Sequence, residues 1–253
     1  MSRSAPSIIL EKLTLREQQA AFPTTQWKWV TQLRSGEETE STQALAELCR
    51  QYWPPIYAFL RRKGHDPATA QDLAQSFFER VITQDIFQGA QPEKGRLRTY
   101  LLASLQNHVA DDRRRARALK RGGGAVVVSL DAEEAEGHYQ NHPTESTTPE
   151  HSYEQAWAAR LLESVHERTR GRYERIGRGH EFTLLEPYLD GVDDAPYPAL
   201  AQQLKQSEAA VRLLVHRMRR RFRAILEEEI ASTVASHEDA EDELRHLFRV
   251  LGR

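Results

Sequence analysis

The sequence predicts an all-α protein made of two helical domains joined by a flexible linker. Apolar residues recur at three- and four-residue steps in several segments, which is the period of a helix buried on one side. No segment shows the strict apolar–polar alternation of a strand. Residues 122–152 mix glycine, proline, serine, threonine and acidic residues, a composition that buries too little apolar surface to fold by itself. The expected order is an N-terminal extension (1–38), a first helical domain (39–121), the linker (122–152), a second helical domain (153–230) and an acidic C-terminal tail (231–253).

The first domain is expected to contain three helices. The first runs from Thr42 to Arg62, with a bend at Pro54 and Pro55. Asp66 is a favourable N-cap for a second helix that begins at Pro67 and carries the apolar residues Ala70, Leu73, Ala74, Phe77, Phe78, Val81 and Ile82. After a loop at 85–95, a third helix spans about 97–118 and buries Leu97, Leu101, Leu105 and Val109.

The end of this third helix is strongly basic, with the sequence DDRRRARALKR at 111–121. Two interpretations stay open. Cations suit the negative end of the helix dipole, so the segment can be a solvated helix end. Clustered arginines also supply most of the sequence-independent affinity for DNA, so it can be a phosphate-contacting face.

The second domain contains a helix-turn-helix pattern at 197–223. A short helix begins near Pro198, and Ser207 is a good N-cap for the next helix, whose first residue, Glu208, suits the positive end of the helix dipole. That second helix carries an apolar stripe, namely Val211, Leu214, Val215, Met218, Phe222 and Ile225. Its other side is expected to expose Arg212, His216, Arg219, Arg220 and Arg223. A cationic helix held across a short companion helix fits a DNA major groove, although a solvated basic face on a core helix is the alternative.

Charge and cysteine content limit the class of protein without deciding its function. The 253 residues carry a formal net charge of −2, yet 96–121 and 205–223 are basic and 227–243 is acidic with no Lys or Arg, which indicates separate surfaces with separate partners. A single cysteine excludes an intramolecular disulfide and indicates a reducing compartment. No apolar run reaches membrane-spanning length, and 1–20 do not form a signal peptide. We expect a soluble, cytoplasmic protein.

Catalytic chemistry finds little support in the sequence. The ten histidines show no HExxH spacing, and the lone cysteine cannot build a zinc site with neighbouring cysteines. Asp111 and Asp112 are adjacent, so they project from different sides of a helix. Gly122–Gly124 are not followed by the Lys and Ser or Thr of a phosphate-binding loop. We therefore expect no enzyme activity, no metal site and no cofactor.

Three segments resemble bacterial sigma-70-type transcription initiation factors. QDLAQSFFERV (71–81) and GRLRTYLLASLQNHVADDRRRARA (95–118) are similar to their region 2, and ALAQQLKQSEAAVRLLVHRMRRRFR (199–223) is similar to their region 4. A linker without a region 3 domain resembles the extracytoplasmic-function (ECF) group. FPTTQW (22–27), the glycine-valine-acidic linker and ELRHLF (243–248) resemble a planctomycete-like subgroup.

The resemblance implies roles for individual residues. It implies that the second helix docks on the clamp of the largest polymerase subunit through Asp72, Leu73, Gln75 and Phe78. It implies contact with the downstream promoter element by Arg98, Tyr100, Asn107, Asp111 and Arg114, with the loop 85–95 holding a flipped base. It implies contact with the upstream element by Ser207, Arg212, His216, Arg217 and Arg220. The implied partners are core RNA polymerase, through its clamp and flap, and promoter DNA. An anti-sigma factor or a regulatory kinase is a further partner that the resemblance leaves open, and no membrane is implied.

The expected function is that of a sigma factor, which brings core polymerase to promoters and assists melting. The alternative is a helix-turn-helix regulator that does not act as a sigma subunit, and such a regulator has no need of the 71–81 and 97–121 segments. The chain departs from the family pattern at Ser76, where an acidic residue is common, and at Leu213, where a small or polar residue is common. For the acidic stretch 227–243, two interpretations stay open: a terminal helix that covers region 4 or the linker, or a regulatory element that competes with DNA for the 212–223 face.

Overall fold

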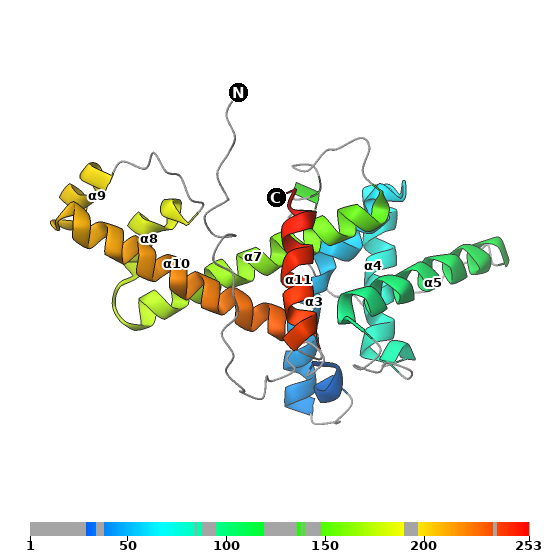
Figure 1. Ribbon diagram of the computed structural model, residues 1–253. Coiled ribbons are helices and arrows are strands. Elements are labelled where there is room, and N and C mark those ends of the chain that lie inside the picture. The colour runs from blue at the N-terminus through cyan, green and yellow to red at the C-terminus, as the bar shows by residue number, and fades with distance from the viewer. Residues whose placement is uncertain are drawn as a thin grey trace. The chain divides into compact units, whose positions relative to one another are not determined.

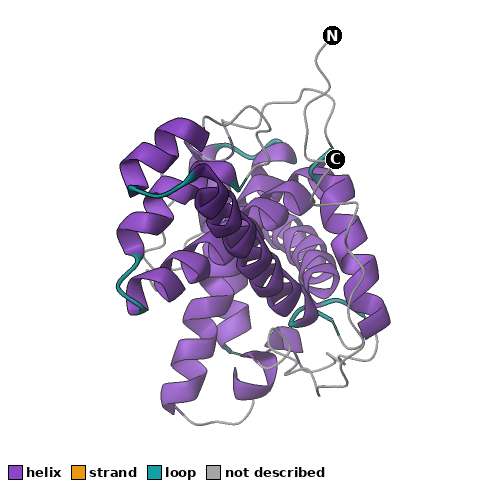
Figure 2. Cartoon of the chain, turned by 60° about the vertical axis from the view of Figure 1, so that its left-hand side comes forward, coloured by secondary structure: helices purple, strands orange, loops and turns teal. Residues whose placement is uncertain are grey.

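The computed structural model describes residues 29–33, 38–83, 85–87, 95–118, 136–137, 139, 148–189, 197–234 and 237–252. Every regular element within these ranges is a helix, and none of them is a strand (Figure 2). The all-α prediction is therefore confirmed. The chain divides into two compact units, and each is described by itself. The bundle unit comprises 22–161 and 230–252, and the helix-turn-helix unit comprises 162–229.

The bundle unit is built from α3 (Glu38–Arg62), α4 (Pro67–Ile82), the short 3-10 helix η1 (Asp85–Phe87), α5 (Leu97–Ala118), the first part of α7 (Pro149–Arg175), and α11 (His237–Val250) (Figure 1). The four leucine and valine positions predicted along α5 are all buried. α3 begins four residues before the predicted start and continues through both of its prolines. The largest fully buried side chains of the bundle unit include Tyr52, Tyr57, Phe59, Phe77, Phe78, Phe87, Tyr153 and Trp157.

The turn between α3 and α4 follows from two local signals. Gly64 has φ +91°, a left-handed conformation that glycine adopts without a Cβ clash, and it ends α3. Asp66 then caps α4, because its Oδ1 accepts a hydrogen bond of 3.1 Å from the Thr69 backbone N–H. Pro67 occupies the first turn, where no intrahelical N–H is required. The predicted cap and helix start are confirmed.

The helix-turn-helix unit contains the end of α7, α8 (Gly179–Leu185), the 3-10 helix η3 (Glu186–Tyr188), α9 (Tyr197–Leu204) and most of α10 (Glu208–Ala231). α8 stops before Pro187, which removes the N–H that would continue it. The core of the unit consists of Tyr173, Phe182, Leu185, Tyr188, Leu189, Leu200, Ala201, Val211, Leu214, Val215 and Met218. The apolar stripe predicted for the second helix is thus buried, with Phe222 packed at its edge.

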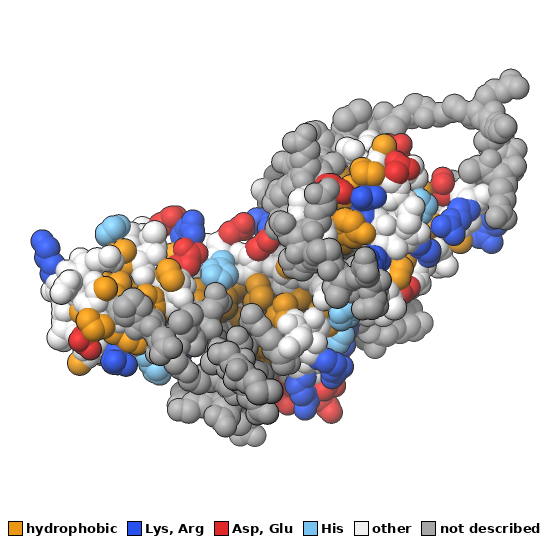
Figure 3. Space-filling view, turned by 90° about the horizontal axis from the view of Figure 1, so that it is seen from above, with side chains coloured by type: hydrophobic (Ala, Val, Ile, Leu, Met, Phe, Trp, Pro, Cys, Tyr) orange, Lys and Arg blue, Asp and Glu red, His pale blue; other side chains and the backbone are white. Residues whose placement is uncertain are grey.

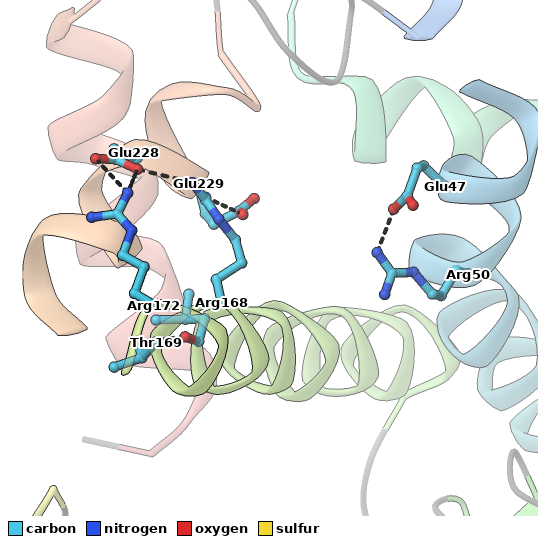
Figure 4. A network of polar contacts seen from close by, with 8 residues as sticks. Glu47, Arg50, Arg168, Thr169, Arg172, Glu228 and Glu229 are labelled. Carbon is cyan, nitrogen blue, oxygen red and sulfur yellow. Dashed lines mark hydrogen bonds and ion pairs between the residues drawn. The ribbon is translucent and has the colours of Figure 1, made fainter. Parts of the chain in front are cut away.

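Acidic side chains near the end of α10 are paired with arginines on α7. Arg168 contacts Glu229 and lies 2.9 Å from Glu228, and Arg172 lies 3.1 Å from Glu228 (Figure 4). Arg223 is 2.9 Å from Glu227 on the same helix. This part of the acidic stretch 227–243 therefore belongs to the packed unit and is paired with internal partners.

Most of the predicted tail forms α11, which belongs to the bundle unit. Ala240, Leu244, Leu247 and Val250 are buried at helical spacing, so α11 contributes a full apolar stripe to that unit. The tail was expected as a separate segment at 231–253. The structure instead makes it a packed helix of the same unit as α3, α4 and α5.

Candidate nucleic-acid and polymerase interfaces

The helix-turn-helix is closed by local backbone contacts. The Ser207 Oγ accepts a hydrogen bond of 3.2 Å from the Ala210 backbone N–H, so Ser207 is the N-cap of α10. At the end of α9, the Gln206 N–H donates to the Ala201 carbonyl at 3.0 Å. The residue between them, Lys205, has φ +52°. Each of these bonds satisfies a backbone group that a helix end would otherwise leave unpaired.

The exposed side of α10 is cationic. His216, Arg217 and Arg220, three of the predicted DNA-contacting residues, are all exposed. Arg217 and Arg220 make no ion pair with any other residue that the structure describes. Their charge is therefore directed at solvent, which is the arrangement that a phosphate-contacting face requires.

Arg212 is exposed but held in place. Its guanidinium lies over the Tyr197 ring, 4.2 Å from the ring centroid. A cation over an aromatic face is attracted by the ring quadrupole and restricts the side chain to one region. Since Tyr197 is the first residue of α9, this contact links the start of the short helix to the first turns of α10.

Three other arginines of α10 are engaged within the unit. Arg219 Nε donates to the Tyr188 carbonyl at 2.8 Å, Arg221 lies over the Tyr173 ring at 5.1 Å, and Arg223 pairs with Glu227. Arg219 and Arg223 were expected on the exposed cationic side, but both are half-buried. Helical periodicity places a residue on a face, whereas the long arginine stem lets its head reach neighbouring carbonyls and carboxylates.

The predicted polymerase-contacting residues of α4 differ in how far their side chains are buried. Asp72 is exposed and Gln75 is half-buried. Leu73 and Phe78 lie in the core, and the Phe78 ring is 5.7 Å from the Trp53 ring. Their side chains therefore stabilise the bundle unit instead of lining a docking surface. Polymerase contact through Asp72 and Gln75 stays a prediction.

Ser76 has a structural partner that the sequence did not indicate. Its Oγ lies 2.8 Å from the Nε2 of His108 on α5, and Arg80 Nη1 lies 3.3 Å from the Nδ1 of the same ring. His108 is only 6% exposed and packs edge-on against Phe77. The one-turn spacing of Ser76 and Arg80 could have indicated this contact, because it places both side chains on the same side of α4.

The exposed part of α5 lies toward its C-terminal end. Asn107 and Arg114 are exposed, and Asp111 is half-buried and pairs with Arg114. Figure 3 shows Lys and Arg side chains gathered over this end of the bundle unit. Tyr100 is half-buried, its hydroxyl donates to the Ile86 carbonyl, and its ring stacks on Phe87 at 6.3 Å. Residues 88–94 of the predicted base-holding loop lie outside the described residues.

Arg98 is placed differently from its predicted role in DNA contact. Its side chain is 3% exposed, and its Nη2 lies 3.0 Å from Glu243 Oε2 of α11, a carboxylate that is 0% exposed. Its Nε is 3.2 Å from Glu154 of α7, and its guanidinium covers the Trp157 ring at 4.7 Å. Arg98 is therefore an internal cation that joins three helices, and the structure corrects its position from surface to core.

The carboxylates around Arg98 have opposite pKa shifts. Burial raises the pKa of Glu243 above its usual value, and the attraction of Arg98 and Arg96 does not overcome this effect. Burial acts in the same direction on Glu154. There, however, the hydrogen bond with His246 at 2.8 Å and the charge of Arg98 outweigh it and lower the pKa.

A described part of the linker is attached to α3. Arg61 contacts the Glu136 carboxylate through Nε at 2.8 Å and Nη2 at 2.9 Å, and the Tyr57 hydroxyl donates to the same carboxylate at 2.6 Å. The Arg61 guanidinium also lies over the Tyr139 ring. Two-point guanidinium–carboxylate contact is strongly directional, so Glu136 is the anchor of this segment.

The described ranges contain neither a metal-binding cluster nor a membrane-spanning helix. No group of three or more His, Cys, Asp and Glu side chains is gathered there as a metal-ion site would need. Likewise, none of the described helices combines the length and the apolarity needed to cross a membrane.

Comparison with known proteins identifies one part of the chain. Residues 48–119 match the family model of sigma-70 region 2, a range that includes α4 and α5. No curated protein and no solved structure matches the chain. Sigma factors are not enzymes, and their region 2 implies core RNA polymerase and promoter DNA as partners. Residues 48–119 of this chain are therefore similar to sigma-70 region 2, and this similarity supports a sigma-factor role in transcription initiation.

Proposed function

We propose that this chain is a promoter-specificity subunit of RNA polymerase of the two-domain, ECF type. The bundle unit supplies region 2, and the helix-turn-helix unit supplies region 4. The proposal rests on two features that occur in one chain. The first is the region 2 match, and the second is a separate unit in which α10, with its exposed cations, follows a turn capped by Ser207. A regulator that only binds duplex DNA has use for the second feature alone.

The two units suit different forms of DNA. A helix with exposed cations, such as α10, fits the major groove of closed duplex, where base edges are distinguishable. The exposed end of α5 with Asn107 and Arg114 suits the backbone of an opened strand, for which basic grooves and stacking platforms are typical. The exposed Asp72 and the half-buried Gln75 on α4 are the proposed polymerase contacts. The planctomycete-like subgroup rests on the motifs at 22–27, in the linker and at 243–248.

Reconstitution with core RNA polymerase tests the proposal. The full chain is mixed with core enzyme and fragmented bacterial DNA, the retained DNA is sequenced, and run-off transcription is measured from the enriched fragments. We expect stable association with core enzyme and transcription that depends on the added chain. Binding to duplex DNA without association with core enzyme would favour the helix-turn-helix regulator.

Two charge variants separate the two interfaces. Asp72→Arg is expected to reduce association with core enzyme while DNA contact by α10 is retained. Arg217→Ala is expected to leave association with core enzyme unchanged and to reduce transcription from closed duplex promoters. Both positions are exposed, so helical content measured by circular dichroism should match that of the unaltered chain. Equal loss of both activities in both variants would contradict the assignment of separate interfaces.

A further inference from the structure

One exposed apolar side chain stands among the cations of α10. Leu213 is 48% exposed, whereas its neighbours Val211, Leu214 and Val215 are buried in the core of the unit. Successive residues of a helix are rotated by about 100°. This rotation places Leu213 opposite the buried stripe, at the centre of the exposed face.

The residues around Leu213 have small or basic side chains. Ala209 lies one turn before it, Arg217 lies one turn after it, and His216 and Arg220 flank the same line. All four are exposed. A single apolar group with a small residue on one side and arginines on the other suits a partner that is apolar at one point and anionic beside it.

We propose that Leu213 contacts the 5-methyl group of a thymine in the major groove of the upstream promoter element. This inference rests on the proposed function of α10. The thymine methyl is the apolar group that base pairs display in the major groove, and phosphates flank it at the distances that arginines reach. Residues in the first turns of a recognition helix face base edges, and Leu213 is in the second turn of α10. Arg217 and Arg220, farther along, then contact phosphate.

Removal of that methyl group tests the contact directly. A duplex is first selected from a random library by the chain bound to core RNA polymerase. Each thymine of the selected upstream element is then replaced, one at a time, by deoxyuridine, which keeps the base pair and deletes only the methyl. We expect a loss of affinity of about fourfold at one position, the effect of one buried methyl-sized group.

Leu213→Ala completes the comparison. With this variant, the thymine and deoxyuridine duplexes should bind equally well, since the methyl no longer has a partner. Leu213→Met, which keeps the volume and apolarity, should retain most of the preference. Ile176→Ala is the matched control, because Ile176 is 54% exposed in the same unit but lies outside α10. It should preserve the full methyl effect.

The outcomes distinguish the two levels of the proposal. If the unaltered chain with core enzyme selects no duplex, the proposed function of α10 fails and this inference fails with it. If it selects a duplex but no thymine shows a methyl effect, the proposed function stands and the Leu213 contact is overturned. A Leu213→Ala loss that is equal on thymine and deoxyuridine duplexes also overturns it, since Leu213 would then act elsewhere.

Discussion

At the scale of single residues, the turn before α10 is held by an unfavourable backbone conformation. Lys205 has φ +52°, although the equivalent turn after α3 uses a glycine, Gly64. A side chain in the left-handed region meets a steric clash that glycine avoids. The helix-turn-helix unit therefore contains strain at the position that determines how α9 meets α10.

Lys205→Gly should stabilise the helix-turn-helix unit by about 1 kcal/mol, because it removes the Cβ clash of the left-handed conformation. The free energy of unfolding from urea denaturation measures this change. Lys205→Ala is the control: it removes the same charge and keeps the Cβ, so it should give no such gain. Equal stabilisation by both variants would assign the effect to the charge.

At the scale of elements, α11 completes the bundle unit. Its apolar stripe is buried, and Glu243 and His246 contact Arg98 and Glu154 on α5 and α7. Removing one partner of a buried ion pair leaves an uncompensated charge, which is usually more costly than the pair is favourable. α11 is therefore a structural part of the unit, and one of its acidic residues, Glu243, is directed inward.

A chain that ends at Val234 should lose much of the stability of the bundle unit, because its core and Arg98 become exposed together. The reactivity of the Cys49 thiol is a measure of this loss of stability. It is buried, and burial raises its pKa to about 12, so the thiol is unreactive in the folded unit. Labelling by a thiol reagent should be much faster in the truncated chain. A chain that ends at Val250 is the control and should label slowly, and equal labelling of the two chains would show that α11 is dispensable.

The pH dependence of unfolding should separate the two carboxylates of this cluster. The pKa of Glu154 is lowered in the folded state, so its contribution is complete above its unfolded value, about 4.3, and is lost as the pH falls through the lowered folded pKa. The pKa of Glu243 is raised, so its contribution is present below about 4.3 and is lost as the pH rises through the raised pKa.

The measurement is the free energy of unfolding of the full chain from pH 3 to pH 7. Glu154→Gln should flatten the loss of stability on the acidic side, and Glu243→Gln should flatten the loss that occurs as the pH rises above about 4.3. The opposite assignment of the two slopes would contradict the pKa directions.

At the scale of the whole molecule, charge is unevenly distributed along the chain. The net charge is only −2, yet the exposed face of α10 is cationic, whereas Glu229 of α10 and Glu243 of α11 pair with Arg168 and Arg98. We therefore expect long-range attraction to DNA to depend on this local face and not on the charge of the chain as a whole.

Arg220→Ala should lower the salt dependence of duplex binding by the equivalent of about one phosphate contact. The slope of log affinity against log salt concentration, measured for the full chain with core enzyme, gives the result. Arg249→Ala is the matched control. Arg249 is exposed on α11, so this substitution removes the same charge from the other unit. If the two variants change the slope equally, the attraction comes from net charge and the assignment of the α10 face is wrong.

Local signals in the sequence were sufficient to predict the helices, their caps and the turn between α9 and α10. The buried positions of α5, the Asp66 and Ser207 caps and the exposure of His216 and Arg220 all follow from interactions within a few residues. These features depend on helical periodicity and on the hydrogen bonds of chain neighbours, so they could be predicted without knowledge of the fold.

The tertiary structure alone decided which polar and aromatic side chains are internal. Arg98 is buried because Glu243, 145 positions later in the chain, and Glu154 neutralise it, and no local pattern reveals such a partner. Contacts with other elements likewise explain three further positions. Phe78 packs against Trp53, Ser76 contacts His108, and Glu136 pairs with Arg61. Periodicity shows that a side chain faces inward or outward, but only the packing of distant helices determines whether a charge there meets solvent, DNA or its own counter-charge.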